Sequence, residues 1–506
     1  MNLFLEIKNR QSVQIPEIPV LEYQSFYSQV LDLLKNENNH CVNYFAFHNE
    51  NKLKFICCIA DDDQHTIHLL SHEMHASMPY PALDSLTAKY FPMHIYEREI
   101  HENFGIPFEN HPWLKPVRYA FDRADRTQTM NNYPFFEITG GETHKVSVGP
   151  IHAGVIEPGH FLFSCTGEDV RHLEIHLGFQ HRGIEKLFIE KKNLLQRTIL
   201  AENIAGDTAV GHALAFVGNI ESLGKVNVSA IVSIERTIAL ELERIAMHIF
   251  DMSNLCIGAA YQLGASVFGA LRTPVINYFQ WWCGNRFAKS LIRTGGSNYP
   301  LTDELAERFT KLLNDFEKTF EEMSERFFSL PSVLARFENI GTISKKQAES
   351  IGAVGLAARV CNVKRDVRSS HPFEYFSKIK HEPVLLDTGD IHARLLLRRM
   401  EIEQSISKIR MLLNEHQKIK TSENSKPVSE LKLQANTLSI SLVEAWRGEI
   451  CHCAVTDSNG EIAYYKVKDP SMHNWFALAL ALRDLEISDF PINNKSFDLS
   501  YCGYDL

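Results

Sequence analysis

Residues 149–208 bring together histidines, glycines and charged side chains at a density that could support chemistry. His152 and His160 lie on a segment rich in glycine and proline, and Arg182 and Glu185 follow within the sequence His-Arg-Gly-Ile-Glu-Lys. An imidazole can take up or donate a proton near neutral pH, which suits proton-coupled chemistry. We therefore predict that this stretch forms one wall of a redox site, with a structural, turn-capping role for His160 as an equal alternative.

Metal binding is the other chemistry that these residue types suggest. His172, His176 and His181 fall on the segment 172–187, which we predict to be helical. On a helix His181 would lie about half a turn away from the face that the other two share. No further ligand follows at a fixed spacing, so we predict no metal site here.

The ten cysteines give no metal-site spacing either, because no Cys-x-x-Cys pair occurs. They are scattered through apolar segments, which is typical of reduced, buried thiols. Cys451 and Cys453 could bring their sulfur atoms together if they lie on one face of a strand. Two small residues on the inner face of that strand, without further chemistry, are the favoured interpretation.

Apolar periodicity and turn residues predict the elements that must position these groups. Strands are expected at 52–60 and 65–70, and a helix that ends at Gly105 is expected to turn Glu97, Arg98 and Glu99 toward solvent. The remaining predictions are tight turns at 149–159 and 167–168, long helices at 226–256, 302–330 and 391–416 with Asp390 as an N-cap, a polar loop at 416–430, strands around 446–449, a turn at 458–460 and a helix at 472–485.

These elements predict an α+β fold. A small α/β module is expected at 1–125, a linker at 126–142, and a mainly α-helical domain with peripheral β hairpins at 143–506. The net charge of -10 disfavours nucleic acid as a partner, because phosphate binding needs a basic surface. The most apolar stretch, 255–275, is interrupted by glycines and Arg272, so no membrane-spanning helix is expected.

The segment Tyr96-Glu-Arg-Glu-Ile with Phe104-Gly-Ile106 and His111-Pro112 resembles the signature of the 30 kDa-type hydrophilic subunit of respiratory complex I. That module is fused to the large subunit in many group 4 [NiFe] hydrogenases. The resemblance implies that residues 1–125 are a docking scaffold rather than a catalyst.

The larger domain resembles the large subunit of group 4 membrane-bound [NiFe] hydrogenases and the 49 kDa-type, quinone-site subunit of complex I. The resemblance rests on segments that occur in the family's order, with the Glu157-Pro-Gly-His-Phe161 turn closer to the hydrogenase branch. These segments are 149–161, 181–186, 241–248, 292–296, 366–375, 389–401 and 444–449.

The metal ligands of that family are missing from this sequence. The family holds nickel and iron with four cysteine thiolates from two motifs, and the matching positions here are Ala205, Thr208, Ser500 and Gly503. The resemblance therefore implies a chain without a NiFe centre and without a metal. Because the substitutes are small, we expect the former metal cavity to stay open, with these four residues and Arg447 as its wall.

The resemblance also implies a function and partners. We expect a peripheral subunit on the cytoplasmic side of the inner membrane that binds an iron–sulfur small subunit of the complex I type and antiporter-like membrane subunits. It would couple electron transfer, with a quinone as one candidate acceptor, to ion translocation. The iron–sulfur cluster would lie in the partner, and no cofactor is predicted in this chain. The candidate catalytic residues are His152, His160, His212, Arg182 and Glu185.

Two alternatives remain open at this stage. One is a structural, catalytically silent subunit of such a complex, and the other is an active hydrogenase. The resemblance implies that a set of charged residues lines the path between the cavity and the membrane partner. A network of salt bridges at a subunit interface explains these charged residues nearly as well. The set is His181, Arg182, Glu185, Asp366, Arg368, Asp390 and Arg394.

Overall fold

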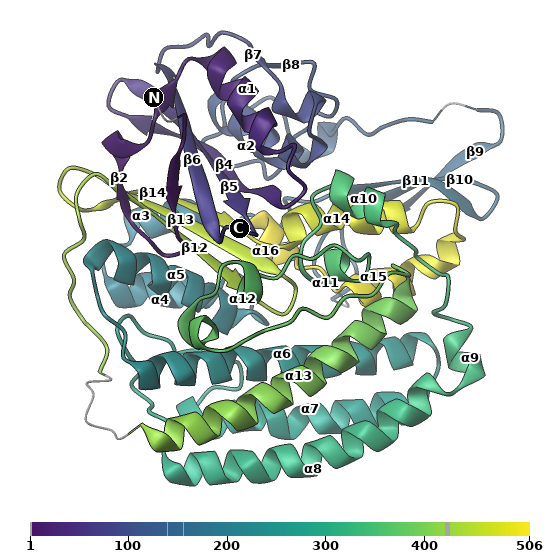
Figure 1. Cartoon of the computed structure of the whole chain (residues 1–506). Helices are drawn as coiled ribbons and strands as arrows, with labels where there is room; N and C mark the ends of the chain where they lie inside the picture. Colours follow the sequence, from purple (N-terminus) through teal and green to yellow (C-terminus); the bar gives the residue numbers. More distant parts are fainter. Residues whose placement is uncertain (1–2, 139, 155, 420–425) are drawn as a thin grey trace.

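The computed structural model describes residues 3–138, 140–154, 156–419 and 426–506. A sheet-rich N-terminal part lies above a layer of long helices, and the C-terminal segments lie between the two (Figure 1). Helices and strands are both abundant and form separate layers, which confirms the predicted α+β class.

A mainly antiparallel sheet forms the N-terminal part, in the strand order β1-β6-β5-β4 with β3 parallel to β6. The predicted strand neighbours are confirmed, since β5 pairs with β6 along its length. Phe55 and Cys57 face one hydrophobic cluster whereas Ile56 and Cys58 face the other, so both sides of this sheet are buried. The elements are β1 (Leu5–Ile7), β3 (Val20–Leu21), α1 (Tyr23–Leu33), β4 (Asn39–Asn49), β5 (Lys52–Asp61), β6 (Thr66–His75), β7 (Leu83–Asp84), α2 (His94–Phe104) and β8 (Phe108–Glu109).

Helix α2 ends as predicted, with Gly105 in the left-handed conformation at a φ of 74°. The prediction of a solvated face on this helix is wrong. Glu97, Arg98 and Glu99 are only 0%, 4% and 5% exposed. Their charges are buried because other segments supply partners; Glu99, for example, accepts from Lys466 Nζ at 2.7 Å.

A second sheet joins the two ends of the chain in the order β14-β13-β12-β2. Its N-terminal strand, β2 (Val13–Gln14), pairs with β12 (Thr437–Glu444). The strands predicted on either side of 446–449 are confirmed as β12 and β13 (Glu449–Thr456), and the turn at 458–460 leads into β14 (Ile462–Lys468). The predicted helix at 472–485 is α14 (Ser471–Ala481), which is shorter than expected.

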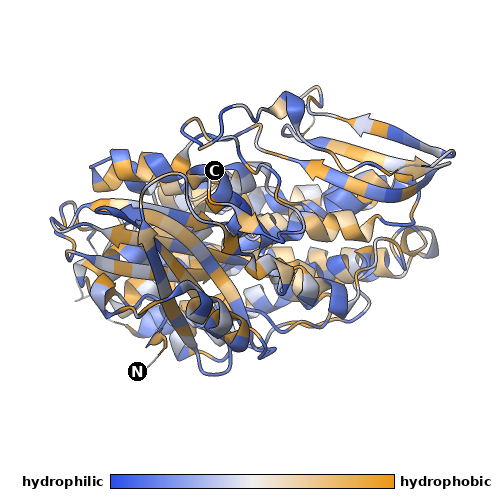
Figure 2. Ribbon diagram, turned by 90° about the horizontal axis from the view of Figure 1, so that it is seen from above, coloured by the Kyte–Doolittle hydropathy of each residue, from blue (hydrophilic) through white to orange (hydrophobic). Residues whose placement is uncertain are grey.

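A three-stranded hairpin sheet projects from the body of the molecule in the order β11-β10-β9. Hydrophilic and hydrophobic residues alternate along it (Figure 2). The turn at 167–168 is confirmed. The tight turn predicted at 149–159 includes residue 155, which lies outside the described residues, and this whole stretch separates the first two strands. The strands are β9 (Thr143–Val148), β10 (His160–Thr166) and β11 (Asp169–His176).

The helix predicted at 172–187 is wrong over its first half. Residues up to His176 belong to β11, and the helix α3 (Ile184–Glu190) begins only after Gly183. His172 and His176 misled the prediction because a spacing of four residues places side chains on one side of a strand as well as of a helix.

Four long helices form the layer at the bottom of Figure 1. The three predicted helices are confirmed as α6 (Ala230–Gly258), α8 (Asp303–Phe328) and α13 (Ile391–Lys418), and α7 (Gln262–Cys283) joins them. Asp390 caps α13 by accepting from Ala393 N at 2.8 Å. Part of the predicted loop at 416–430 lies outside the described residues. No helix within those residues is long and apolar enough to cross a membrane.

Shorter elements connect these layers. They are η1 (Ile15–Glu17), η2 (Leu86–Ala88), η3 (Phe91–Met93), η4 (Met130–Asn132), α4 (Leu194–Ala201), α5 (Ala209–Gly224), α9 (Pro331–Leu334), α10 (Lys345–Ser350), α11 (Gly355–Arg359), α12 (Val367–Ser370), η5 (Glu374–Lys378), η6 (Ile487–Asp489), α15 (Phe490–Phe497) and α16 (Tyr501–Asp505).

Candidate functional site

Two segments that are far apart in the sequence meet in the structure. They are the first motif segment, residues 203–208, and the second motif segment, residues 498–503. Arg182 donates to two carbonyl oxygens of the first segment at 2.7 and 2.8 Å and to one carbonyl oxygen of the second at 3.0 Å. Arg182 therefore holds the two segments together through their backbones.

Arg447 lies at the junction of the two motif segments. Its Nη1 and Nη2 donate to the carboxylate of Asp207 at 2.7 and 2.8 Å, and its Nε donates to the carbonyl of Asp498 at 2.5 Å. The guanidinium also stacks on Trp446, 3.9 Å from the ring centre. Burial opposes ionisation of Asp207, but Arg447 outweighs it and lowers the pKa of that carboxyl.

The four positions that the resemblance aligns with thiolate ligands carry small residues, which make other contacts. Ala205 and Thr208 are buried, and Thr208 Oγ1 accepts from Arg447 at 3.2 Å. Ser500 caps α16 by accepting from Gly503 N at 2.9 Å. A side chain at Gly503 would collide with Asp469, whose Oδ2 lies 2.6 Å from an ideal Cβ position.

The cavity beside Arg447 and Trp446 measures about 10 Å³. That volume holds about one water molecule and no larger group. Of the predicted wall residues, Thr208 contacts Arg447 directly, and Arg447 bridges the two motif segments through Asp207 and Asp498.

His212 lies in α5 within a buried chain of hydrogen bonds. Its Nε2 lies 3.1 Å from Asp469 Oδ2, and its Nδ1 lies 3.1 Å from His452 Nε2. His452 Nδ1 in turn lies 2.8 Å from the hydroxyl of Tyr465. Burial and the neighbouring His212 lower the pKa of His452 well below the ordinary histidine value, which keeps that ring neutral.

The candidate histidines of the hairpin are held within the hairpin itself. His152 Nε2 lies 2.8 Å from the carbonyl oxygen of Gly159, and His160 Nε2 lies 2.7 Å from Ser147 Oγ. Gly149, at a φ of 88°, leaves room for the close approach of the Gly159 carbonyl, because a Cβ at position 149 would lie 2.2 Å from that oxygen. Burial lowers the pKa of His160, so its ring is neutral at pH 7.

Glu185 does not reach the motif junction. It accepts from Lys466 Nζ and from Val467 N, both at 2.9 Å, at the wall of a cavity of about 780 Å³ that Arg182 also lines. Lys466 also pairs with Glu99 at 2.7 Å. Burial lowers the pKa of Lys466 to about 8, so this lysine lies near its titration point at physiological pH.

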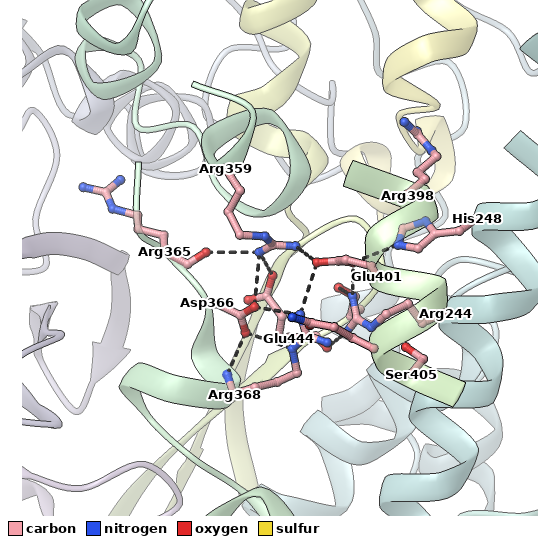
Figure 3. A network of polar contacts seen from close by, with 12 residues as sticks. Arg244, His248, Arg359, Arg365, Asp366, Arg368, Arg398, Glu401, Ser405 and Glu444 are labelled. Carbon is pink, nitrogen blue, oxygen red and sulfur yellow. Dashed lines mark hydrogen bonds and ion pairs between the residues drawn. The ribbon is translucent and has the colours of Figure 1, made fainter. Parts of the chain in front are cut away.

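A buried network of charged residues connects α6, α11, α12 and α13 with the end of β12 (Figure 3). Glu401 is its centre: it pairs with Arg359 at 2.7 Å, with His248 at 2.8 Å and with Arg244 at 3.1 Å. These side chains have no exposed surface. Because every one of them has a partner of opposite charge or a hydrogen-bond partner, the network can exist without solvent.

Glu444 is the member of the network that titrates near neutral pH. It accepts from Arg359 Nη1 at 2.6 Å. Burial and the nearby carboxylate of Asp366 raise its pKa to about 7, although Arg359 acts in the opposite direction. Glu401 differs, because its arginine partners outweigh burial and hold its pKa well below the ordinary range.

The charged set expected from the family divides between several places. Asp366 and Arg368 pair at 2.7 Å and belong to the network around Glu401. Asp390 caps α13, and Arg394 donates to Ser496 Oγ at 2.8 Å, so both stabilise local structure. Of the remaining members, Arg182 lies at the motif junction and Glu185 lies with Lys466 at the wall of the larger cavity. His181 Nδ1 lies 2.7 Å from the carbonyl oxygen of Asp505.

Sequence reasoning missed Asp207 and Arg359. Arg359 had a detectable signal, because it is a single charge within the apolar segment Val354-Gly-Leu-Ala-Ala-Arg-Val360, which is typical of a buried ion. Asp207 had no such signal: only the folded chain brings Arg447 to it.

The residues at the motif junction do not fit a nickel–iron centre. Such a centre needs four converging thiolates, and the four positions carry no sulfur. Within the described ranges, His, Cys, Asp and Glu side chains form no group of three or more that could hold a metal ion. Cys451 and Cys453 lie on one face of β13 with their sulfurs 3.8 Å apart, as predicted, and both thiols are free.

Comparison with family models divides the chain into two modules. The model of the respiratory-chain NADH dehydrogenase 49 Kd subunit matches residues 265–505, and the model of the 30 Kd subunit matches residues 24–124.

Several curated proteins are similar over most of the chain. Hydrogenase-4 component G of Escherichia coli is 23% identical over 81% of this chain and 73% of its own length. The membrane-bound hydrogenase subunit alpha of Pyrococcus furiosus is 26% identical over 70% of this chain and 85% of its own length. The C/D subunit of the NADH-quinone oxidoreductase of Phocaeicola vulgatus is 26% identical over 77% of this chain and 79% of its own length.

Among solved structures, a chain of the membrane-bound sulfane sulfur reductase, an archaeal respiratory membrane complex, has the same fold. The TM-score is 0.66 at 22% sequence identity, over 72% of this chain and 99% of that chain. The two family models and the relatives together identify the chain as a fused 30 kDa- and 49 kDa-type subunit, which belongs to the family of membrane-bound hydrogenase and NADH-quinone oxidoreductase subunits.

Proposed function

We propose that this chain couples electron transfer to ion translocation in a complex I-like, hydrogenase-related membrane complex, and that it does so without a nickel–iron centre. The observation that carries the proposal is the buried network around Glu401, with Glu444 as its titrating member. A network of fixed charges with one group near its titration point can take up and release a proton without unfolding.

The network and the motif junction are adjacent in the sequence. Glu444 and Arg447 lie three residues apart in the turn between β12 and β13, and Arg244 donates to the carbonyl oxygens of Glu444 and Ala445 at 2.8 and 3.3 Å. A change of charge at Glu444 would therefore act on the same turn that positions Arg447. This connection supports a coupling role for the network.

The electron donor and acceptor would lie next to this chain. We propose an iron–sulfur subunit of the complex I type as donor, antiporter-like membrane subunits as the ion-translocating partners, and the cytoplasmic side of the membrane as the location. A quinone-like acceptor would approach along the hairpin loop 149–159, where His152 and His160 lie. Because Arg447 bridges the two motif segments, the acceptor would bind beside the junction and not within it.

A catalytically silent, structural subunit is the second candidate. The observation that favours it is the ion pair of Arg447 with Asp207, which ties the two motif segments together. Under this alternative the buried network stabilises the fold, and its protonation has no role in turnover.

The two candidates are separated by Glu444→Gln in the complete complex, reconstituted in vesicles. If the network couples proton movement to electron transfer, the number of ions moved per electron falls while the electron-transfer rate is retained. Glu97→Gln is the matched control, because Glu97 is equally buried but lies in α2. An unchanged ratio in Glu444→Gln would favour the silent subunit.

Two further measurements test the remaining parts of the proposal. Metal analysis of the purified complex is expected to give no stoichiometric nickel in this chain; stoichiometric nickel would overturn the absence of a nickel–iron centre. His152→Ala and His160→Ala are expected to lower turnover with a quinone acceptor, and unchanged turnover in both would exclude the hairpin as the acceptor site.

A further inference from the structure

A second cavity lies apart from the motif junction, between the N-terminal part, the linker and α14. It measures about 640 Å³, which is within the size range of small-molecule sites. Its floor is apolar and buried, with Leu177, Met472 and Trp475 each at most 4% exposed. Its mouth opens at Phe136, which is 54% exposed, and at Arg483.

One side of the cavity carries a buried positive charge. Arg98 is 4% exposed and has no carboxylate within 4 Å among the described residues. Its Nε and Nη2 donate to the carbonyl oxygens of Lys115 and Pro116, both at 2.8 Å, whereas its Nη1 donates to no group of the described residues. A buried guanidinium without a counter-ion is costly, so this charge favours an anion in the cavity.

A buried imidazole lies one helical turn away from this charge. His94 is 2% exposed, lines the same cavity, and neither of its ring nitrogens has a hydrogen-bond partner. It stacks on Phe91 at 4.7 Å and lies 5.3 Å from Trp113 between ring centres. Burial and the positive charge of Arg98 lower its pKa well below the ordinary value, so the ring is neutral and can donate one hydrogen bond.

The remaining charged residues around the cavity do not cancel Arg98. Glu174 is the single acidic residue of the lining, and it is already paired with Lys115. Arg483 adds a further cation at the mouth. The lining is thus positively charged in a protein whose net charge is -10.

We infer that this cavity binds a small molecule with an apolar body and one carboxylate, whose head contacts Arg98 and His94 and whose body lies against Trp475 and the apolar floor. Arg98 Nη1 and one nitrogen of His94 would each donate a hydrogen bond to the carboxylate. Two sources have this chemistry: a fatty acid, which the membrane supplies, and an aromatic acid from solution.

Calorimetric titration of the purified full-length chain tests the inference with three probes: dodecanoate, 1-naphthoate and the uncharged 1-naphthamide. Naphthoate is expected to bind at least about tenfold more tightly than naphthamide, which is the effect of one charge-assisted hydrogen bond. Equal binding of acid and amide would overturn the role of Arg98. Tighter binding of dodecanoate than of naphthoate identifies a fatty acid as the ligand, and the reverse order identifies an aromatic acid.

Two variants test whether the ligand binds in this cavity. Ala479→Trp fills the cavity from α14 without altering a charge and is expected to abolish binding of the acids. Arg98→Gln is expected to remove the preference for the acid over the amide. If Arg98→Gln fails to fold, the comparison of acid and amide in the unaltered chain still decides the charge requirement. Unchanged affinity in Ala479→Trp, or no binding of either acid at millimolar concentration, would overturn the inference.

Discussion

Arg447 forms a two-pronged ion pair with Asp207 at 2.7 and 2.8 Å, between the two motif segments, residues 203–208 and 498–503. The pair joins a β-turn to the start of α5, and Arg447 is 5% exposed whereas Asp207 is 36% exposed. A planar guanidinium suits this double contact, which a lysine cannot reproduce.

Arg447→Lys is therefore expected to lower the free energy of unfolding by about 1.5–3 kcal/mol, the range for hydrogen bonds to charged groups. Urea denaturation of the purified chain measures this change. Arg399→Lys is the matched control, because Arg399 forms one partly exposed ion pair with Glu403 at 2.9 Å, beside the ring of Phe328, and its effect should be below about 0.5 kcal/mol. Equal effects of the two substitutions would contradict the special role of Arg447.

Glu444 should make the stability of the fold depend on pH. Its pKa is raised from 4.5 to about 7 in the folded chain by burial and by Asp366. Between these two pH values the folded state keeps a proton that the unfolded state has released, so stability falls as pH rises through this window, by up to about 1.4 kcal/mol per pH unit.

The glutamine of Glu444→Gln cannot release a proton, so the variant should lack the loss of stability that the titration of Glu444 causes as pH rises. Thermal unfolding of both proteins at pH 5, 6, 7 and 8 provides the test, with the unaltered chain expected to lose stability faster than the variant between pH 5 and 7. Parallel curves for the two proteins would show that Glu444 does not titrate in this range.

Glu97 should contribute to stability far more than a surface residue does. Its carboxylate accepts hydrogen bonds from the hydroxyls of Ser85 and Thr87, both at 2.6 Å, and from Leu86 N at 2.7 Å. Glu97→Ala would leave these buried donors unpaired and is expected to cost about 2–4 kcal/mol. Glu321→Ala, on the exposed side of α8, should cost less than about 0.5 kcal/mol. Chemical denaturation distinguishes the two, and a small effect at Glu97 would restore the prediction of a solvated helix face.

Gly503, one of the four positions that the resemblance aligns with thiolate ligands, should not tolerate a side chain. Gly503→Ala would place its Cβ 2.6 Å from Asp469 and 2.8 Å from Ser500 Oγ. We expect a loss of about 1–3 kcal/mol, the usual cost of overpacking. Gly206 in the first motif segment is the matched control, because a Cβ there would meet nothing within 4 Å. Equal melting temperatures for Gly503→Ala and Gly206→Ala would show that Asp469 moves aside at little cost.

The sequence by itself determined the fold class and the long helices, because these depend on local patterns. The apolar stripes of α6, α8 and α13 repeat every three or four residues, and Gly105 and Asp390 mark helix ends with short-range chemistry. It also determined that four ligand positions lack sulfur, since that is a matter of residue identity. Where two periodicities coincide, as at His172 and His176, the local pattern was ambiguous and the prediction of a helix was wrong.

The tertiary structure alone decided which charges are buried and with which partner. Glu97 and Glu99 are residue types that usually lie on an exposed helix face. Here other segments of the chain cover them and donate hydrogen bonds to their carboxylates. Arg447 and Asp207 are 240 residues apart, and no local pattern relates them. The burial of a charge is a property of all the segments packed around it, so the pairing of Arg447 with Asp207 exists only in the folded chain.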